Sequence, residues 1–138
     1  MIVVDTCVLI DVASGDVNWQ DWSAAQLDLW SARGPLIING IIYAELATGF
    51  DSIEALEQFF HAAVLQLRPL TRSALYLAGR ARTLYRKRAG TRAGLLADFL
   101  IAAQAADLGC PVLTRDTARF SSYFPQLTLV TPRPVIPK

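Results

Sequence analysis

The chain has 138 residues, of which 53% are hydrophobic and 18% charged, and its formal net charge is +1. This size favours one globular domain over residues 1–138, because chains of about 150 residues bury roughly 68–70% of their unfolded surface. No apolar run approaches the ~20 residues of a membrane span. The acidic residues Asp5 and Asp11 stand where a signal peptide would have its basic n-region, so we expect no signal peptide. Cys7 and Cys110 are far apart and have neither a metal-binding spacing nor the pattern of a disulfide framework, so we expect a protein of the reducing cytoplasm. Because the apolar runs are short, we expect no membrane partner.

The first half of the chain alternates between apolar strands and helices. Residues 1–5 predict a buried strand, and Thr6 is the expected N-cap of a helix that ends at residue 14. A second helix is predicted over 19–33 and a second strand over 35–38. Two further helices, 40–49 and 52–63, are separated at Gly49, with Ser52 as the second N-cap.

The second half continues the alternation. Residues 64–70 predict a third strand, and Thr71 caps a helix that ends near residue 89. A helix rich in small residues follows over 95–108, and Gly109 occupies its C′ position. The fourth and fifth strands are predicted over 111–114 and 127–131.

Short strands that alternate with helices predict an α/β fold, in which a five-stranded parallel sheet is the middle layer of a three-layer α/β/α sandwich. In such sheets the functional crevice lies at the carboxyl ends of the strands, where the strand order reverses. Asp5 ends the first predicted strand and is therefore a candidate site residue.

Four acidic residues stand alone in or directly after apolar stretches: Asp5, Glu45, Asp98 and Asp116. Two of them follow predicted strands, and the other two lie on helices that are otherwise apolar. If the first and fourth strands are neighbours, Asp5 and Asp116 come close, since adjacent strands lie about 4.8 Å apart. Converging carboxylates repel one another, and a divalent cation removes that conflict. Mg²⁺ takes such oxygen ligands and assists phosphoryl chemistry, so the pattern points to metal-assisted cleavage of a phosphate ester.

Each acid also has a structural interpretation. Asp5 could cap the helix that follows it, and Asp116 could cap a short helix over 117–122. Asp98 could be a first-turn acid that complements the helix dipole, and Glu45 could pair with an arginine. The only histidine, His61, is expected at the surface or its boundary rather than in catalysis.

The acids lie in stretches that resemble a known family in order and spacing. The chain is similar to PIN-domain proteins, and most closely to the VapC-type ribonuclease toxins of bacterial and archaeal toxin–antitoxin pairs. The similar stretches are VVDTCVLIDV (3–12), IIYAELATG (41–49), ADFLIAAQAADLG (97–109) and PVLTRDTARF (111–120). The resemblance implies a single PIN domain whose first and fourth strands are neighbours.

By the same resemblance, Asp5, Glu45, Asp98 and Asp116 bind Mg²⁺ or Mn²⁺ and cut single-stranded or loop RNA, leaving 5′-phosphate and 3′-hydroxyl ends. It also implies a homodimer and a cognate antitoxin protein. Thr6 neighbours the first acid and is a candidate supporting residue, and Thr114 matches a hydroxyl that the family often keeps near the site. The chain departs from the family at Cys7, where Asn is usual; a thiol cannot hydrogen-bond as an amide does.

Charge is distributed unevenly along the chain. Residues 1–57 hold nine acids and one base, whereas residues 58–97 hold eight bases and no acid. The basic segment could guide an RNA backbone, or it could be the solvated face of an amphipathic helix. Arg92 and Arg88 are the candidate RNA contacts there, and Arg115 is another, beside the fourth acid.

Four other functions compete with a ribonuclease toxin. A phosphoaspartate-type phosphatase would need a second Asp at position 7, and a receiver domain would need a lysine late in the fold, so the sequence disfavours both. An inert PIN scaffold that binds RNA or protein, or a PIN nuclease of RNA processing without a toxin role, stays open. The three tryptophans, Trp19, Trp22 and Trp30, are expected to pack a helix on the sheet, with a role in an interface as the alternative.

Overall fold

The sheet is parallel throughout and has five short strands. The computed structural model describes residues 1–89, 96–117, 120–121 and 124–132. Its strands are arranged in the order β3-β2-β1-β4-β5. Their bounds are β1 Ile2–Val4, β2 Leu36–Ile38, β3 Leu65–Leu67, β4 Val112–Leu113 and β5 Leu129–Val130. The predicted neighbourhood of the first and fourth strands is therefore confirmed.

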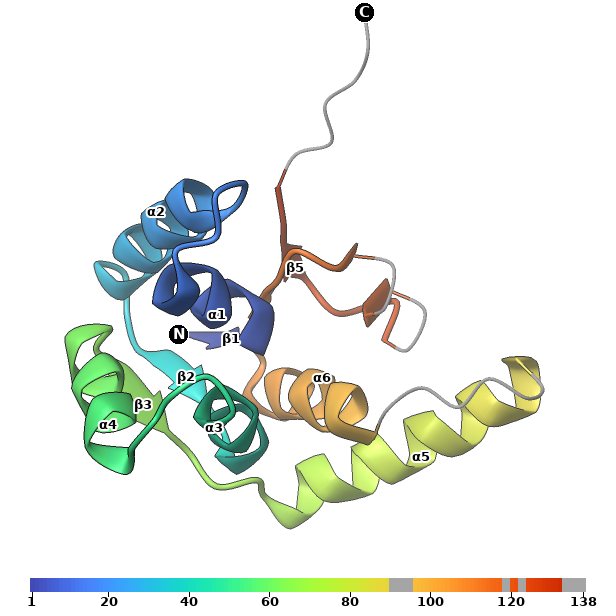
Figure 1. Ribbon diagram of the computed structural model, residues 1–138. Coiled ribbons are helices and arrows are strands. Elements are labelled where there is room, and N and C mark those ends of the chain that lie inside the picture. The colour runs from blue at the N-terminus through green and yellow to red at the C-terminus, as the bar shows by residue number, and fades with distance from the viewer. Residues whose placement is uncertain (90–95, 118–119, 122–123, 133–138) are drawn as a thin grey trace, which may run out of the picture.

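Among the described residues, six helices lie in the connections between β1, β2, β3 and β4. Their bounds are α1 Thr6–Ser14, α2 Gln20–Ser31, α3 Gly40–Ala47, α4 Ile53–Ala62, α5 Arg72–Ala89 and α6 Leu96–Leu108. The chain steps from β1 to β2 to β3 in one direction and then returns across the sheet to β4. Since such crossovers are right-handed, α1 to α4 and the α5–α6 pair cover opposite faces. This is the α/β/α arrangement predicted from the sequence. Figure 1 shows the long α5 extending past α6, against which it packs.

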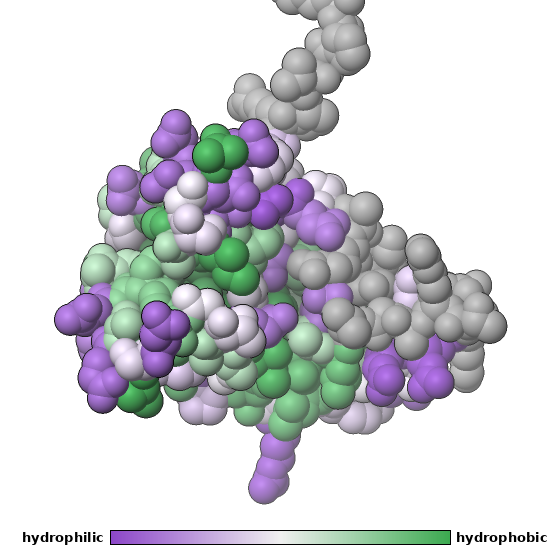
Figure 2. All heavy atoms as spheres, in the orientation of Figure 1, coloured by the Kyte–Doolittle hydropathy of each residue, from purple (hydrophilic) through white to green (hydrophobic). Residues whose placement is uncertain are grey.

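The core lies between the sheet and the helices. The strands β1 and β2 are fully buried, which explains their continuous apolar sequence. Helix α6 is buried over Asp98–Ala105, so its run of small residues is the surface that packs on the sheet. Large apolar side chains also remain exposed on α5, at Leu75, Leu77 and Leu84. Figure 2 shows apolar and hydrophilic side chains mixed on the face it presents.

Helix caps follow the sequence with one correction. Ser52 accepts from the backbone N–H of Ala55 and Thr71 from that of Ala74, so both predicted N-caps are confirmed. Gly109 has a φ of +68°, a left-handed conformation that ends α6 as expected. The predicted N-cap at Thr6 is wrong, because the residue before it is extended and its side chain caps α1.

Within the part of the chain described, no helix is both long enough and apolar enough to cross a membrane.

Candidate active site

The candidate site lies where the strand order reverses, between β1 and β4. These strands pair in parallel with Val3 opposite Val112 and Val4 opposite Leu113. Their carboxyl ends therefore meet at the same edge of the sheet, with Asp5 level with Thr114. This is the crevice in which open α/β sheets bind their ligands.

Asp5 caps α1 and also lines the candidate pocket, so a capping role does not exclude a role at the site. It is 2% exposed, and its Oδ1 accepts from the backbone N–H of Thr6 at 2.8 Å. Its Oδ2 accepts from the hydroxyl of Thr114 at 2.8 Å and from the thiol of Cys7 at 3.3 Å. Three donors, two from the start of α1 and one from the residue after β4, thus fix the orientation of this carboxylate.

Glu45 is presented by the middle of α3. Its side chain is exposed at the pocket, and its Oε1 accepts from the hydroxyl of Thr6 at 2.7 Å. The arginine partner considered from the sequence does not appear, since the one salt bridge among the described residues joins Arg115 and Asp11.

Asp98 lies in the first turn of α6 and is 6% exposed. The N-terminal end of a helix carries partial positive charge, which favours a carboxylate there. The same residue therefore has the dipole role that the sequence allowed and a position at the site.

The three acids Asp5, Glu45 and Asp98 line one open pocket of about 390 Å³. The pocket is completed by Thr6, Cys7, Ile10 and Thr48. The carboxylates come from a strand end and from two helices, which no local sequence pattern brings together.

Asp116 does not line this pocket in the described structure. It is exposed, and its backbone N–H donates to the hydroxyl of Thr114 at 3.0 Å. Thr114 thus joins Asp5 to the segment that carries Asp116. The helix expected over 117–122 falls largely outside the described residues.

Within the described ranges, no three His, Cys, Asp or Glu side chains are already close enough to enclose a metal ion. The donor set nevertheless fits Mg²⁺ or Mn²⁺, because the pocket offers hard carboxylate and hydroxyl oxygens and leaves room for water and a substrate phosphate.

Cys7 occupies the position where Asn was expected. Burial, and next the negative charge of Asp5, raise the pKa of its thiol from 9.0 to about 11. The thiol is therefore protonated at neutral pH and donates to Asp5, while its sulfur lies 3.8 Å from the hydroxyl of Thr114. A weak donor replaces the amide that the family resemblance implied.

The candidate RNA-contacting arginines have different environments. Arg115 is bound to Asp11 through two hydrogen bonds, at 2.7 and 2.8 Å, and its pKa is raised above its ordinary value by this hydrogen bonding. Arg92 and the side chain of Arg88 lie outside the described residues. His61 is exposed, as expected.

A buried amide network connects the helices that carry Glu45 and Asp98. Asn39 caps α3 by accepting from two backbone N–H groups, and its side-chain amide donates to Gln104 of α6 at 3.0 Å. Gln104 in turn donates to the backbone carbonyl of Arg68. Neither residue was predicted from the sequence. Asn39 could have been found as a cap residue between a strand and a helix, but its pairing with Gln104 has no local signal.

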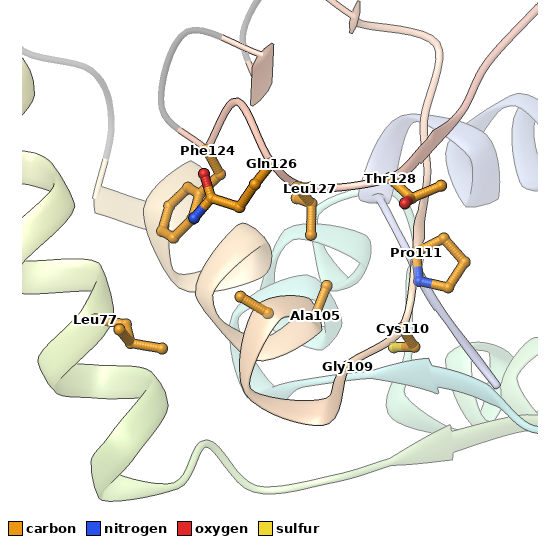
Figure 3. Close-up of a pocket in the computed structure, with 10 residues that line it drawn as sticks. Leu77, Ala105, Gly109, Cys110, Pro111, Phe124, Gln126, Leu127 and Thr128 are labelled. Atoms are coloured by element: carbon orange, nitrogen blue, oxygen red, sulfur yellow. The ribbon is translucent and has the colours of Figure 1, made fainter.

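A larger cavity, of about 520 Å³, lies between α5, α6 and the segment before β5 (Figure 3). Leu77, Ala105, Phe124 and Leu127 are among the ten residues that line it, and none of the ten carries a charge. The acidic pocket is the better candidate for phosphate chemistry despite its smaller volume.

Known structures share this fold. A structure of VapBC2 from Rickettsia felis bound to a promoter DNA fragment aligns with a TM-score of 0.73 and 21% sequence identity. The alignment covers 96% of this chain and 100% of the matched chain. A toxin–antitoxin complex from Klebsiella pneumoniae aligns at 0.72 and 21%, over 96% of the chain and 98% of the match. FitAcB from Neisseria gonorrhoeae aligns at 0.65 and 22%, over 94% and 96%.

Comparisons of sequence give a family match but no individual relative. No curated protein matches the chain significantly. The family pattern of the PIN domain, in contrast, matches residues 2–123, which include all four candidate acids. The chain therefore belongs to the PIN domain family.

Proposed function

We propose that the chain is a Mg²⁺- or Mn²⁺-dependent endoribonuclease that cleaves single-stranded or loop RNA, and that it is the toxin of a toxin–antitoxin pair. The observation that carries the proposal is the convergence of Asp5, Glu45 and Asp98 on one open pocket at the reversal point of the sheet. Membership of the PIN domain family supports nuclease chemistry on such acids.

In this proposal Asp5, Glu45 and Asp98 would hold the metal ion, and Asp116, whose backbone N–H donates to Thr114, is the fourth acid of the set. A bound ion of this kind lowers the pKa of a water molecule and neutralises charge on the phosphate. The residues around the acids keep them oriented: Thr6 donates to Glu45, and Thr114 donates to Asp5. Their hydroxyls act by holding the carboxylates in place and do not contact the RNA in this proposal.

The toxin role and the partners rest on the similar structures. These structures are of VapBC2 bound to a fragment of promoter DNA and of a toxin–antitoxin complex. By analogy we assign this chain a cognate antitoxin. The resemblance to VapC-type toxins, rather than these structures, implies a homodimer as its assembled form. Arg88 and Arg92 remain candidate contacts to the RNA backbone.

Purified protein incubated with RNA tests the nuclease. We expect cleavage with Mg²⁺ or Mn²⁺, products with 5′-phosphate ends, and no cleavage in EDTA. Asp98→Asn should abolish cleavage, while Asp21→Asn, which changes an exposed first-turn acid of α2, should leave it intact. Cleavage that survives both EDTA and Asp98→Asn would refute the mechanism, and RNA binding without cleavage by the native protein would favour an inert scaffold.

Expression in a bacterial host tests the toxin role separately. We expect the native chain to arrest growth, Asp98→Asn to allow growth, and co-expression of a small adjacent gene to relieve the arrest. An active nuclease that leaves growth unaffected would favour RNA processing instead.

A further inference from the structure

Outside the acidic pocket, the buried carboxylate of Asp11 on α1 accepts three hydrogen bonds from side chains. Its carboxylate accepts from Nε of Arg115 at 2.7 Å and from Nη2 at 2.8 Å. The hydroxyl of Ser23, on α2, donates to it at 2.7 Å. A buried carboxylate with three strong donors has a single defined position.

Arg115 is held from a second side by an aromatic ring. Its guanidinium carbon lies 5.0 Å from the centroid of Trp19, which precedes α2. A two-pronged pairing with a carboxylate and stacking on a ring are the contacts for which arginine is better suited than lysine. Two of the five N–H donors of Arg115 are thus bound to Asp11, and its side chain is 29% exposed.

The position of Arg115 in the chain gives this cluster a further role. The residue lies between Thr114, which donates to Asp5, and Asp116, whose backbone N–H donates to Thr114. Helix α1 begins after Asp5 and carries Asp11 within its second turn. The segment 114–116 is therefore attached to α1 at two points.

We propose that Arg115 is a positioning residue: by pairing with Asp11 it fixes the segment that presents Thr114 and Asp116 to the acidic site, and it does not contact the RNA. This inference rests on the proposed nuclease function and assigns a role within that site. It replaces the RNA contact expected for Arg115 from the sequence.

The test uses Arg115→Lys, which keeps a positive charge beside Asp11 but loses the paired hydrogen bonds and the planar stacking. We expect kcat for RNA cleavage to fall about 10- to 100-fold, since small misplacements of a site group cost that much. KM and the dependence of RNA binding on salt should stay unchanged. Arg33→Lys is the matched control, because Arg33 also lies over a tryptophan, at 5.2 Å from the Trp30 ring, and is remote from the site.

A second variant separates positioning from RNA contact. Asp11→Asn removes the charged partner and leaves Arg115 intact. A positioning role predicts the same fall in kcat, with Arg115→Lys adding little in the double variant. A role in RNA contact predicts normal cleavage in Asp11→Asn. It predicts a raised KM in Arg115→Lys and in Arg115→Gln, and in Arg115→Gln the slope of RNA affinity against salt concentration should also fall by about 1.

A third measurement needs no nuclease activity. The backbone amide of Asp116 should exchange hydrogen severalfold faster in Arg115→Lys and in Asp11→Asn than in the native chain, and at the native rate in Arg33→Lys. If the native protein cleaves no RNA but exchange changes in this way, the positioning relationship holds and only the proposed function fails. Unchanged kcat together with unchanged exchange in the folded variants would overturn the inference.

Discussion

The hydroxyl of Thr6 donates to Oε1 of Glu45 at 2.7 Å across 39 residues of sequence. Thr6 begins α1, directly after the buried Asp5, whereas Glu45 is exposed on α3. The bond therefore holds the long side chain of Glu45 to the first residue of α1, next to Asp5. It also gives Thr6 a role different from the N-cap that the sequence suggested.

Thr6→Val should lower catalysis without unfolding the chain. Valine keeps the shape of threonine but leaves Glu45 without this donor, so we expect kcat to fall about 10- to 100-fold with little change in KM. Thr6→Ser should restore most of the rate. Thr83→Val is the control, because Thr83 is an exposed helix residue whose hydroxyl bonds only a backbone carbonyl of α5. Equal rates in the native protein and Thr6→Val would show that the hydrogen bond from Thr6 to Glu45 does not support catalysis.

Thr114→Val should affect stability as well as activity. The hydroxyl of Thr114 is buried, donates to Asp5 and accepts from the amide of Asp116. Its loss leaves a buried carboxylate with one donor fewer and a backbone amide without its acceptor, which costs about 1–3 kcal/mol each at most sites. Urea unfolding should show a lower midpoint at an unchanged slope. Unaltered stability would mean that water replaces the hydroxyl.

Sequence reasoning was sufficient for the elements whose cause is local. Alternating apolar strands and helices, the caps at Ser52 and Thr71, and the left-handed Gly109 were all predicted and confirmed. Thr6 was the exception, because Asp5 and Thr6 are both good caps and the pattern alone does not choose between them. The extended backbone of Asp5, at φ −67° and ψ 148°, decides it.

The candidate site could be predicted only in outline. The four acids were visible as isolated charges, and three of them line one pocket. The order of the strands predicted only that Asp5 and Asp116 come close. Pairings such as Asn39 with Gln104 and Asp11 with Arg115 span 65 and 104 residues. They depend on how α1, α3 and α6 pack, and tertiary packing leaves no spacing rule in the sequence. Asp116 follows a strand as predicted, yet the turn after β4 leaves it outside the lining of the pocket.

Metal ions should stabilise the folded chain even without RNA. Binding to the native state alone adds about 2.7 kcal/mol of stability at a hundredfold excess over Kd. We expect Mn²⁺ to raise the thermal midpoint of the native protein and of Asp21→Asn, and EDTA to reverse the rise. Asp98→Asn should lose this response, measured against its own metal-free midpoint. A metal response retained in Asp98→Asn would show that the ion binds elsewhere.

Cys7 should react slowly with alkylating reagents at neutral pH. Its pKa is raised to about 11, first by burial and then by the charge of Asp5. Raising the pKa of a thiol lowers its reactive thiolate fraction below that pKa, so at pH 8 about one molecule in a thousand is thiolate, against about one in ten for a pKa of 9.0.

The measurement is iodoacetamide labelling of Cys110→Ser protein in EDTA, followed by mass spectrometry across a pH series. Labelling of Cys7 should rise steadily from pH 8 toward pH 11 and should be faster in Asp5→Asn, because that change removes the second cause of the shift while burial remains. A labelling midpoint near pH 9 in the native sequence would contradict the buried, protonated thiol. In that case Cys7 would be a thiolate beside the acids under mildly alkaline conditions, and the departure from the family's Asn would change the charge of the site as well as its hydrogen bonding.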